Sequence, residues 1–415
     1  MPTLKLRERL SGPGGVNFRL VFTSTTISGL GDGVATIALA FAVLDISDSP
    51  AALGAVIAAR QVAAAGITVL AGVWADRLPR HLVLVAAAVV QAITQATSGV
   101  LVLTGEATVP ALAALALVFG LADGFVIPAS QGLIPTIVAS ARLQQANALL
   151  GLTRSVVGVA GPALGGVMVA VGSPGGALLA DAGSFAAAAL LLVRLRMPAT
   201  AAAAAARPFF HELREGWTEF RRHTWLWTTI VFFGIGNFAG ASYYVLGPLI
   251  AKQSLGGVAA WATIVSAFGV GTIIGGLIAL RIRPRRPLLA SCLAAIPYSI
   301  PMLAIALELP VPILVGVSTI AGVGIAIHLA LWFTVFQQQV PEHAQSRVAS
   351  YDTLGSFVLM PIGMALVGPL ADAIGIVETL WLALIVMWAS WAAILLLPSV
   401  WAIRRSAAAP APSPA

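Results

Sequence analysis

The chain has 415 residues, of which 59% are hydrophobic and only 9% are charged, and its mean hydropathy is +0.95. So few polar side chains cannot cover a surface that faces water, which excludes a soluble globular protein. The net charge is +7, and the single cysteine, Cys292, excludes an internal disulfide and a CxxC-type metal or redox site. The composition therefore indicates a membrane protein.

Twelve apolar segments approach or exceed about 20 residues, the length that crosses roughly 30 Å of hydrocarbon. Their even spacing leaves no room for a further domain. The first six are predicted at residues 18–44, 51–74, 82–104, 109–132, 145–171 and 176–194. The second six are predicted at residues 225–250, 258–280, 287–307, 310–337, 349–372 and 377–400. We therefore expect an all-α polytopic protein with an N-terminal half (1–194) and a C-terminal half (225–401).

Residues 195–224 join the two halves and carry aromatic and apolar residues at helical spacing. This pattern predicts an amphipathic helix along the inner membrane surface, which serves as a tether rather than as a regulatory site. Residues 402–415 are rich in Ser, Ala and Pro, and a disordered cytoplasmic tail is predicted there. The apolar face of the linker consists of Phe209, Phe210, Leu213, Trp217 and Phe220.

Lys and Arg fall almost entirely on one side of the predicted spans, whereas the loops on the other side carry Lys252 with Asp45, Asp48, Glu106 and Glu308. Basic residues that flank a span resist translocation, so both termini are expected to be cytoplasmic, in the inner (plasma) membrane. Basic loops beside anionic lipid account for the charge, and no nucleic-acid partner is expected. We expect a monomer.

The sequence Gly29-Leu30-Gly31-Asp32 returns 205 positions later as Gly234-Ile235-Gly236-Asn237. Solenoid repeats have periods of roughly 20 to 50 residues. Two apolar copies of about 200 residues are instead typical of secondary transporters built from two related halves. Other matching pairs are Arg77 with Arg281, Asp123 with His328, Pro135 with Pro341, Arg142 with Arg347, Asn147 with Asp352, and Gly161-Pro162 with Gly368-Pro369.

The loop between the second and third spans contains Gly72, Asp76, Arg77 and Arg80 at the spacing G-x-x-x-D-R-x-x-R. This motif resembles the loop signature of the major facilitator superfamily, and the resemblance covers nearly the whole chain. It implies the major facilitator fold, with two pseudo-symmetric halves of six helices, and a gating role for the loop. The alternative is that the loop serves topology only. Leu280 stands where the second copy of the motif would carry Asp.

Gly161, Pro162, Gly165 and Gly166 in the fifth span resemble the exporter signature of that superfamily, and they predict a bend at a close helix contact. Phrases such as Asp181-Ala-Gly-Ser-Phe185 resemble the branch of drug:proton antiporters that contains macrolide-efflux and enterobactin-exporter proteins. Gly158 lies one residue late for the first glycine of that signature. The Arg that many drug exporters carry in the fourth span is absent.

Four ionisable residues stand out well inside the predicted spans: Asp32, Arg60, Asp123 and Arg154. A charge at the bilayer centre costs roughly 2.5 to 3.5 kcal/mol, so each needs a partner or a function. Asp32 or Asp123 is predicted to carry a proton; the alternative is a permanent Asp–Arg pair that fixes helix register. Arg60 and Arg154 either replace the missing arginine or form such static pairs.

Further polar residues within spans are cavity candidates: Asn237, Tyr243, Tyr244, Gln91, Gln95 and His328. Hydrogen bonds between helices explain them equally well, and for His328 we favour a packing role. Asp181 lies just inside the outer end of the sixth span and is expected near water. Carboxylates of the first half have no acidic counterpart in the second, so the first half is predicted to carry protons.

These patterns lead to a proton-coupled exporter of a small amphipathic molecule, such as a drug, a macrolide-like compound or a siderophore, working by alternating access. The proton gradient would supply the energy, and neither a cofactor nor a metal is expected. An uncoupled or inward-directed solute or lipid transporter is the alternative. A polytopic enzyme or receptor is more distant, because the spans lack a cluster with metal-ligand spacing and a nucleophile beside a base.

Overall fold

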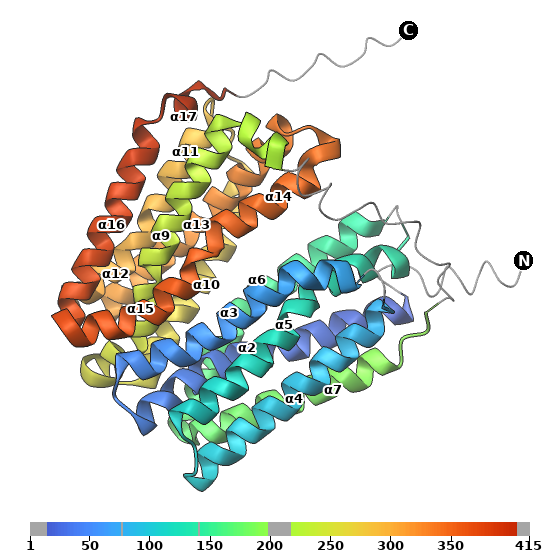
Figure 1. Ribbon diagram of the computed structural model, residues 1–415, viewed down its shortest axis with the longest axis vertical. Coiled ribbons are helices and arrows are strands. Elements are labelled where there is room, and N and C mark those ends of the chain that lie inside the picture. The colour runs from blue at the N-terminus through green and yellow to red at the C-terminus, as the bar shows by residue number, and fades with distance from the viewer. Residues whose placement is uncertain (1–14, 76–77, 140–141, 198–216, 405–415) are drawn as a thin grey trace, which may run out of the picture.

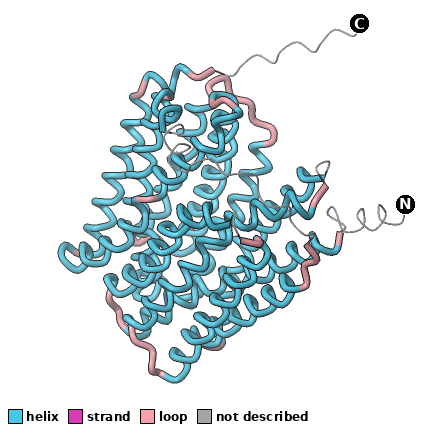
Figure 2. The backbone as a smooth tube through the Cα atoms, turned by 45° about the vertical axis from the view of Figure 1, so that its right-hand side comes forward, coloured by secondary structure: helices cyan, strands magenta, loops and turns pink. Residues whose placement is uncertain are grey.

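The structure is a computed structural model in which residues 15–75, 78–139, 142–197 and 217–404 are described. The described residues form helices joined by short loops (Figure 2), and twelve helical segments are long and apolar enough to cross a membrane. The predicted all-α architecture with twelve spans is confirmed. In the N-terminal half the helices are α2 (Val16–Ile46), α3 (Pro50–Ala75), α4 (Arg80–Thr104), α5 (Val109–Ile137), α6 (Leu143–Val171) and α7 (Pro174–Val193).

Two spans of the C-terminal half, the ninth and the eleventh, are interrupted near proline residues. Pro297 and Pro301 lack an amide N–H and interrupt the ninth span, and Pro361 follows the break in the eleventh. The helices are α9 (Thr224–Ile250), η2 (Ala251–Leu255), α10 (Val258–Ala279), α11 (Pro287–Ala295), η3 (Ile296–Ser299), α12 (Ile300–Ala306), α13 (Val311–Gln339), α14 (Glu342–Phe357), α15 (Leu359–Ile374), α16 (Ile376–Leu396) and α17 (Pro398–Ala402).

The helices run between two ends of the bundle. One end of the bundle, called here the basic end, holds the start of α4, the loop before α11 and the end of α17. The other, called the acidic end, holds the α2–α3 loop and η2. The two groups of helices diverge toward the basic end (Figure 1), where α2 begins and α17 ends.

The hydrophobic core explains this divergence. At the acidic end one cluster is shared by both halves and joins Leu44 and Leu53 to Val245, Trp261 and Met364. At the basic end each half has a cluster of its own, one built by residues 18–195 and the other by residues 220–400. Among the described residues, the buried apolar cluster that joins the two halves therefore lies at the acidic end.

The predicted linker helix lies mostly outside the described residues, and Phe209, Phe210 and Leu213 are among those not described. Residues 217–222 are helical. The ring of Phe220 stacks on Trp217 and on Tyr351 of α14, with a centroid separation of 5.6 Å in both pairs. The end of the linker thus packs on the C-terminal half. At the other terminus α17 reaches Ala402, and residues 405–415 of the predicted tail lie outside the description.

Candidate functional site

Two acids and one base from three helices meet inside the N-terminal half. Arg60 of α3 donates a hydrogen bond of 2.6 Å from Nη2 to Oδ1 of Asp32 on α2. The same Nη2 lies 3.9 Å from Oδ2 of Asp123 on α5. The prediction that these intramembrane charges pair is therefore confirmed for Arg60, which serves both carboxylates. Because there is one guanidinium for two acids, the cluster carries a net charge of −1 when both acids are ionised.

Neighbouring side chains hold this cluster. The guanidinium of Arg60 lies over the ring of Phe119, 4.2 Å from its centroid, where the ring face attracts a cation. Gln91 of α4 donates a hydrogen bond of 3.3 Å to Oδ1 of Asp123. Gln91 is buried, so it belongs to the support of Asp123 and does not line an open cavity. Gly120 on α5 lets the backbone of α3 approach, since a Cβ there would meet the carbonyl oxygen of Arg60.

The three charged side chains differ in exposure. The side chain of Arg60 is 18% exposed, whereas those of Asp32 and Asp123 are 39% and 40% exposed. The arginine is thus enclosed by its neighbours, while both carboxylates remain open enough to exchange protons or contact a ligand. An enclosed cation between two accessible acids suits a switch in which protonation of one acid changes the pairing of the other.

The expectation that Asp181 on α7 lies near water is wrong. Its side chain is fully buried, and its oxygens accept hydrogen bonds from Gln95 at 2.6 Å and Ser184 at 3.1 Å. Gly31 of α2 packs against this group, since a Cβ there would collide with Asp181 and Ser184. A polar residue near the end of a span reaches water only if it faces outward, and Asp181 faces α4 and α2 instead.

Arg154 of α6 does not join the cluster. It is exposed, and within the described ranges it forms no ion pair with an acid within 4.0 Å. Arg60 therefore pairs with the acids, whereas the sequence left the choice between Arg60 and Arg154 open. Helix packing accounts for the pairing with Asp123, because α3 packs chiefly along α5, which carries that acid, whereas α6 packs chiefly on α2 and α10.

The gating motif is only partly described. Gly72 lies in the last turns of α3, and Asp76 and Arg77 lie outside the described residues. Arg80 begins α4 and donates a hydrogen bond of 2.6 Å to the carbonyl oxygen of Gly132 on α5. A Cβ at Gly132 would lie 2.5 Å from Cζ of Arg80, so the glycine makes room for the arginine. The sequence did not predict this partnership, because a glycine within a span gives no signal of the side chain that packs on it.

The glycines of the exporter motif lie at close helix contacts. A Cβ at Gly161 would lie 2.8 Å from Cα of Gly33, and a Cβ at Gly165 would lie 2.9 Å from Cα of Val34, both on α2. Gly166 faces Ala262 of α10 in the other half. Pro162 is buried within α6. The close approach that small residues permit is therefore present, and it extends across the boundary between the halves.

Two cavity candidates are engaged in bonds between helices. Asn237 of α9 donates a hydrogen bond of 2.8 Å to the carbonyl oxygen of Ser356, beside the break between α14 and α15. His328 of α13 is buried, with Nδ1 2.9 Å from Oγ of Ser291 and its ring 5.0 Å from that of Phe233. The packing role favoured for His328 agrees with these contacts.

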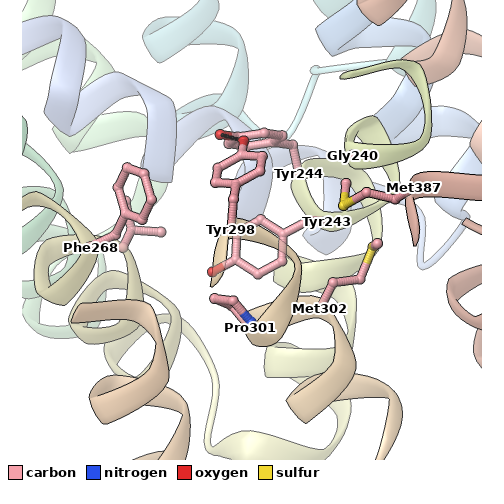
Figure 3. Close-up of a pocket in the computed structure, with 9 residues that line it drawn as sticks. Gly240, Tyr243, Tyr244, Phe268, Tyr298, Pro301, Met302 and Met387 are labelled. Carbon is pink, nitrogen blue, oxygen red and sulfur yellow. Dashed lines mark hydrogen bonds between the residues drawn. The ribbon is translucent and has the colours of Figure 1, made fainter. Parts of the chain in front are cut away.

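Tyr243 lines a cavity of about 50 Å³ within the C-terminal half (Figure 3). The hydroxyls of Tyr244 and Tyr298 share a hydrogen bond of 2.7 Å at this cavity. Its wall combines aromatic rings with thioether side chains, which adapt to ligands of different shape. The volume holds only about three to five water molecules, so a larger ligand requires the wall to open. The cavity is lined by Gly240, Tyr243, Tyr244, Val265, Phe268, Tyr298, Pro301, Met302 and Met387.

A polar contact closes the acidic end. Nζ of Lys252 in η2 lies 3.1 Å from Asp45 and 3.1 Å from Asp48, and it donates to the carbonyl oxygen of Leu44. Lys252 belongs to the C-terminal half and its three partners to the N-terminal half. The sequence placed one cation among acids on this side, but it did not predict the contact. In the described part of the chain no group of three His, Cys, Asp or Glu residues is arranged to hold a metal ion.

Residues 21–364 match the profile of the Major Facilitator Superfamily. The chain belongs to this superfamily. It is therefore a secondary transporter of a small molecule with twelve membrane spans, and not an enzyme. The chain is 25% identical over 376 residues to the multidrug efflux pump Tap of Mycolicibacterium fortuitum, covering 87% of this chain and 90% of that one. It is 26% identical over 382 residues to Tap of Mycobacterium tuberculosis (strain ATCC 25618 / H37Rv), covering 87% and 88%.

Solved structures of other transporters overlay most of the chain. A bacterial homologue of the human lysosomal transporter Spinster, inward-facing and unoccupied, gives a TM-score of 0.73 at 14% identity and covers 95% of this chain and 97% of its own. The nucleoside transporter NupG gives a TM-score of 0.67 at 16% identity, covering 93% and 99%. At these identities the likeness shows the fold alone.

Proposed function

We propose that this Major Facilitator Superfamily protein exports a small amphipathic molecule in exchange for protons. The observation that carries the proposal is the cluster of Asp32, Arg60 and Asp123, in which one enclosed cation serves two accessible acids. Similarity to proteins named multidrug efflux pumps supports the direction of transport and the breadth of substrates.

The coupling follows from the charge of the cluster. With both acids ionised the cluster carries −1, and uptake of one proton makes it neutral. Protonation of Asp32 weakens its 2.6 Å bond to Arg60, which then moves toward Asp123, 3.9 Å away. Because Asp32 lies on α2 and the other two on α3 and α5, this exchange alters the contact between helices and links protonation to the rocking of the halves.

The substrate class follows from two surfaces. The net negative cluster attracts a basic nitrogen, which competes with the proton for the same carboxylates. The cavity beside Tyr243 and Met302 offers aromatic rings and thioethers for an apolar group. We infer a substrate that combines an aromatic or apolar body with a cationic amine.

The orientation also follows from charge. The basic end would be cytoplasmic, because Lys and Arg beside the spans resist translocation. In that orientation the described arrangement, closed by the shared core at the acidic end, faces the cytoplasm. Both termini would then be cytoplasmic, in the plasma membrane.

The test is transport by purified protein in liposomes under an imposed pH gradient, with an aromatic amine as substrate. Asp32→Asn and Asp123→Asn, singly and together, are compared with Asp372→Asn, an exposed acid at the end of α15. We expect the gradient to drive accumulation in the wild type and in Asp372→Asn, and the double variant to lose the gradient dependence. Undiminished gradient-driven transport in the double variant would show that the cluster is a static ion pair that fixes helix register. Wild-type transport that ignores the gradient would indicate an uncoupled transporter.

A further inference from the structure

A cavity of about 580 Å³ lies at the basic end of the C-terminal half, apart from the transport site. It is formed where the loop before α11 meets the residues that follow α17. The two segments are held together because Leu288 of α11 and Val400 of α17 are both fully buried in the same hydrophobic cluster. The cavity is lined by Pro284, Arg285, Arg286, Leu289, Ala290, Leu293 and Arg404.

The mouth of this cavity is strongly cationic. Arg285 and Arg286 come from the loop before α11, and Arg404 comes from the opposite wall beyond α17. Arg286 lies over the ring of Trp401, 5.5 Å from its centroid, which fixes the direction of its guanidinium. No acid is found among the described residues that line the cavity. Three guanidiniums without a neighbouring carboxylate favour a bound anion, and the planar guanidinium matches phosphate oxygens in pairs.

The inner wall of the cavity is apolar. Leu289 and Leu293 are four residues apart on α11 and therefore lie one above the other along the same face. Leu293 is 48% exposed, and this stretch of α11 begins the ninth membrane span. Because Leu293 belongs to the ninth span, the wall would run from the arginines at the membrane boundary toward the hydrocarbon. A soluble anion would not contact this apolar wall, whereas an acyl chain can pack along it.

We propose that this cavity binds an anionic phospholipid, with its phosphate held by Arg285, Arg286 and Arg404 and an acyl chain along Leu289 and Leu293. A charged mouth above an apolar wall, at the depth where headgroups lie, matches a phospholipid in both chemistry and position. The bound lipid bridges the loop before α11 to the segment after α17. It adds a polar link between two parts of the chain that pack through apolar side chains.

The experiment measures lipid bound to the purified full-length protein by native mass spectrometry, after exposure to phosphatidylcholine vesicles with or without phosphatidylglycerol. We expect phosphatidylglycerol to remain bound while phosphatidylcholine is lost. Arg285→Gln combined with Arg286→Gln and Arg404→Gln should weaken phosphatidylglycerol binding at least tenfold. Arg281→Gln with Arg283→Gln is the control and is matched in charge to Arg285→Gln with Arg286→Gln, because these arginines lie in the same loop but do not line the cavity. It should change binding less than twofold.

Three outcomes would overturn the proposal. Equal losses in the two sets of variants would indicate diffuse attraction to the basic loop. Unchanged binding in the first set would place the lipid elsewhere. Displacement of phosphatidylglycerol by inorganic phosphate, with Leu293→Gln having no effect, would indicate a site for a soluble anion. If the triple variant does not fold, Arg404→Gln alone, near the end of the described chain, should still lower binding severalfold.

Discussion

The side-chain amide of Gln95 donates a hydrogen bond of 2.6 Å to Asp181, and this bond joins α4 to α7 around a fully buried carboxyl group. Among the described residues Asp181 forms no ion pair within 4.0 Å, and its oxygens accept hydrogen bonds from the neutral side chains of Gln95 and Ser184. A group so enclosed has no direct path to water in this arrangement. We therefore assign Asp181 to the stability of the N-terminal half.

Substitution of Asp181 tests this assignment. Asp181→Asn keeps the shape and can still accept from Gln95, so transport and its gradient dependence should persist. Asp181→Leu leaves the amide of Gln95 buried without a partner, and the loss should be about 1–3 kcal/mol of stability. Thermal unfolding in detergent measures the second effect, and liposome transport measures the first. Loss of gradient dependence in Asp181→Asn would instead make this acid a proton carrier.

The difference between Asp32 and Asp181 shows what the sequence can predict. Asp32 lies near the middle of a span, so the cost of its charge already predicts a partner, and Arg60 is a candidate on the next span. The burial of Asp181 depends on which helix packs against its face, and on Gly31 having no side chain there. The length, number and order of the spans follow from local composition. The direction in which a side chain such as Asp181 faces is set by contacts between distant segments. The choice of Arg60 over Arg154 has the same cause.

The contact between Gly161 and Gly33 predicts a second effect. A Cβ at Gly161 would lie 2.8 Å from Cα of Gly33 and 3.3 Å from the carbonyl oxygen of Leu30, and backbone atoms cannot rotate away. Gly161→Ala should therefore destabilise the packing of α6 on α2, by about 1–3 kcal/mol. Gly151→Ala in the same helix is the control, because a Cβ there meets open space. Thermal unfolding compares the two, and equal melting temperatures would contradict the contact.

Gly368 makes a corresponding contact between the halves. A Cβ at Gly368 of α15 would collide with the backbone at Ala51 of α3, at the acidic end. Gly368→Ala should therefore disfavour the packed arrangement and populate one in which the halves separate at this end. Spin labels on α3 and α15 report the separation by their distance distribution. Gly316→Ala, where a Cβ meets nothing within 4 Å, should leave the distribution unchanged. An unchanged distribution in Gly368→Ala would show that the halves part elsewhere.

Lys252 should stabilise the same packed arrangement by a smaller amount. Its partners Asp45 and Asp48 are 56% and 71% exposed, and exposed ion pairs contribute roughly 0.2–1 kcal/mol each. Lys252→Gln removes both pairs and should therefore shift the population of separated halves about two- to thirtyfold, in the direction of Gly368→Ala. Raising the salt concentration to about 1 M should produce part of this shift in the wild type and little in the variant, because salt screens exposed charges. Lys252→Arg keeps the charge and serves as the control. If salt moved the wild type and Lys252→Gln equally, the ion pairs would have no part in closing this end, and the shared apolar core around Trp261 and Leu53 would hold it alone.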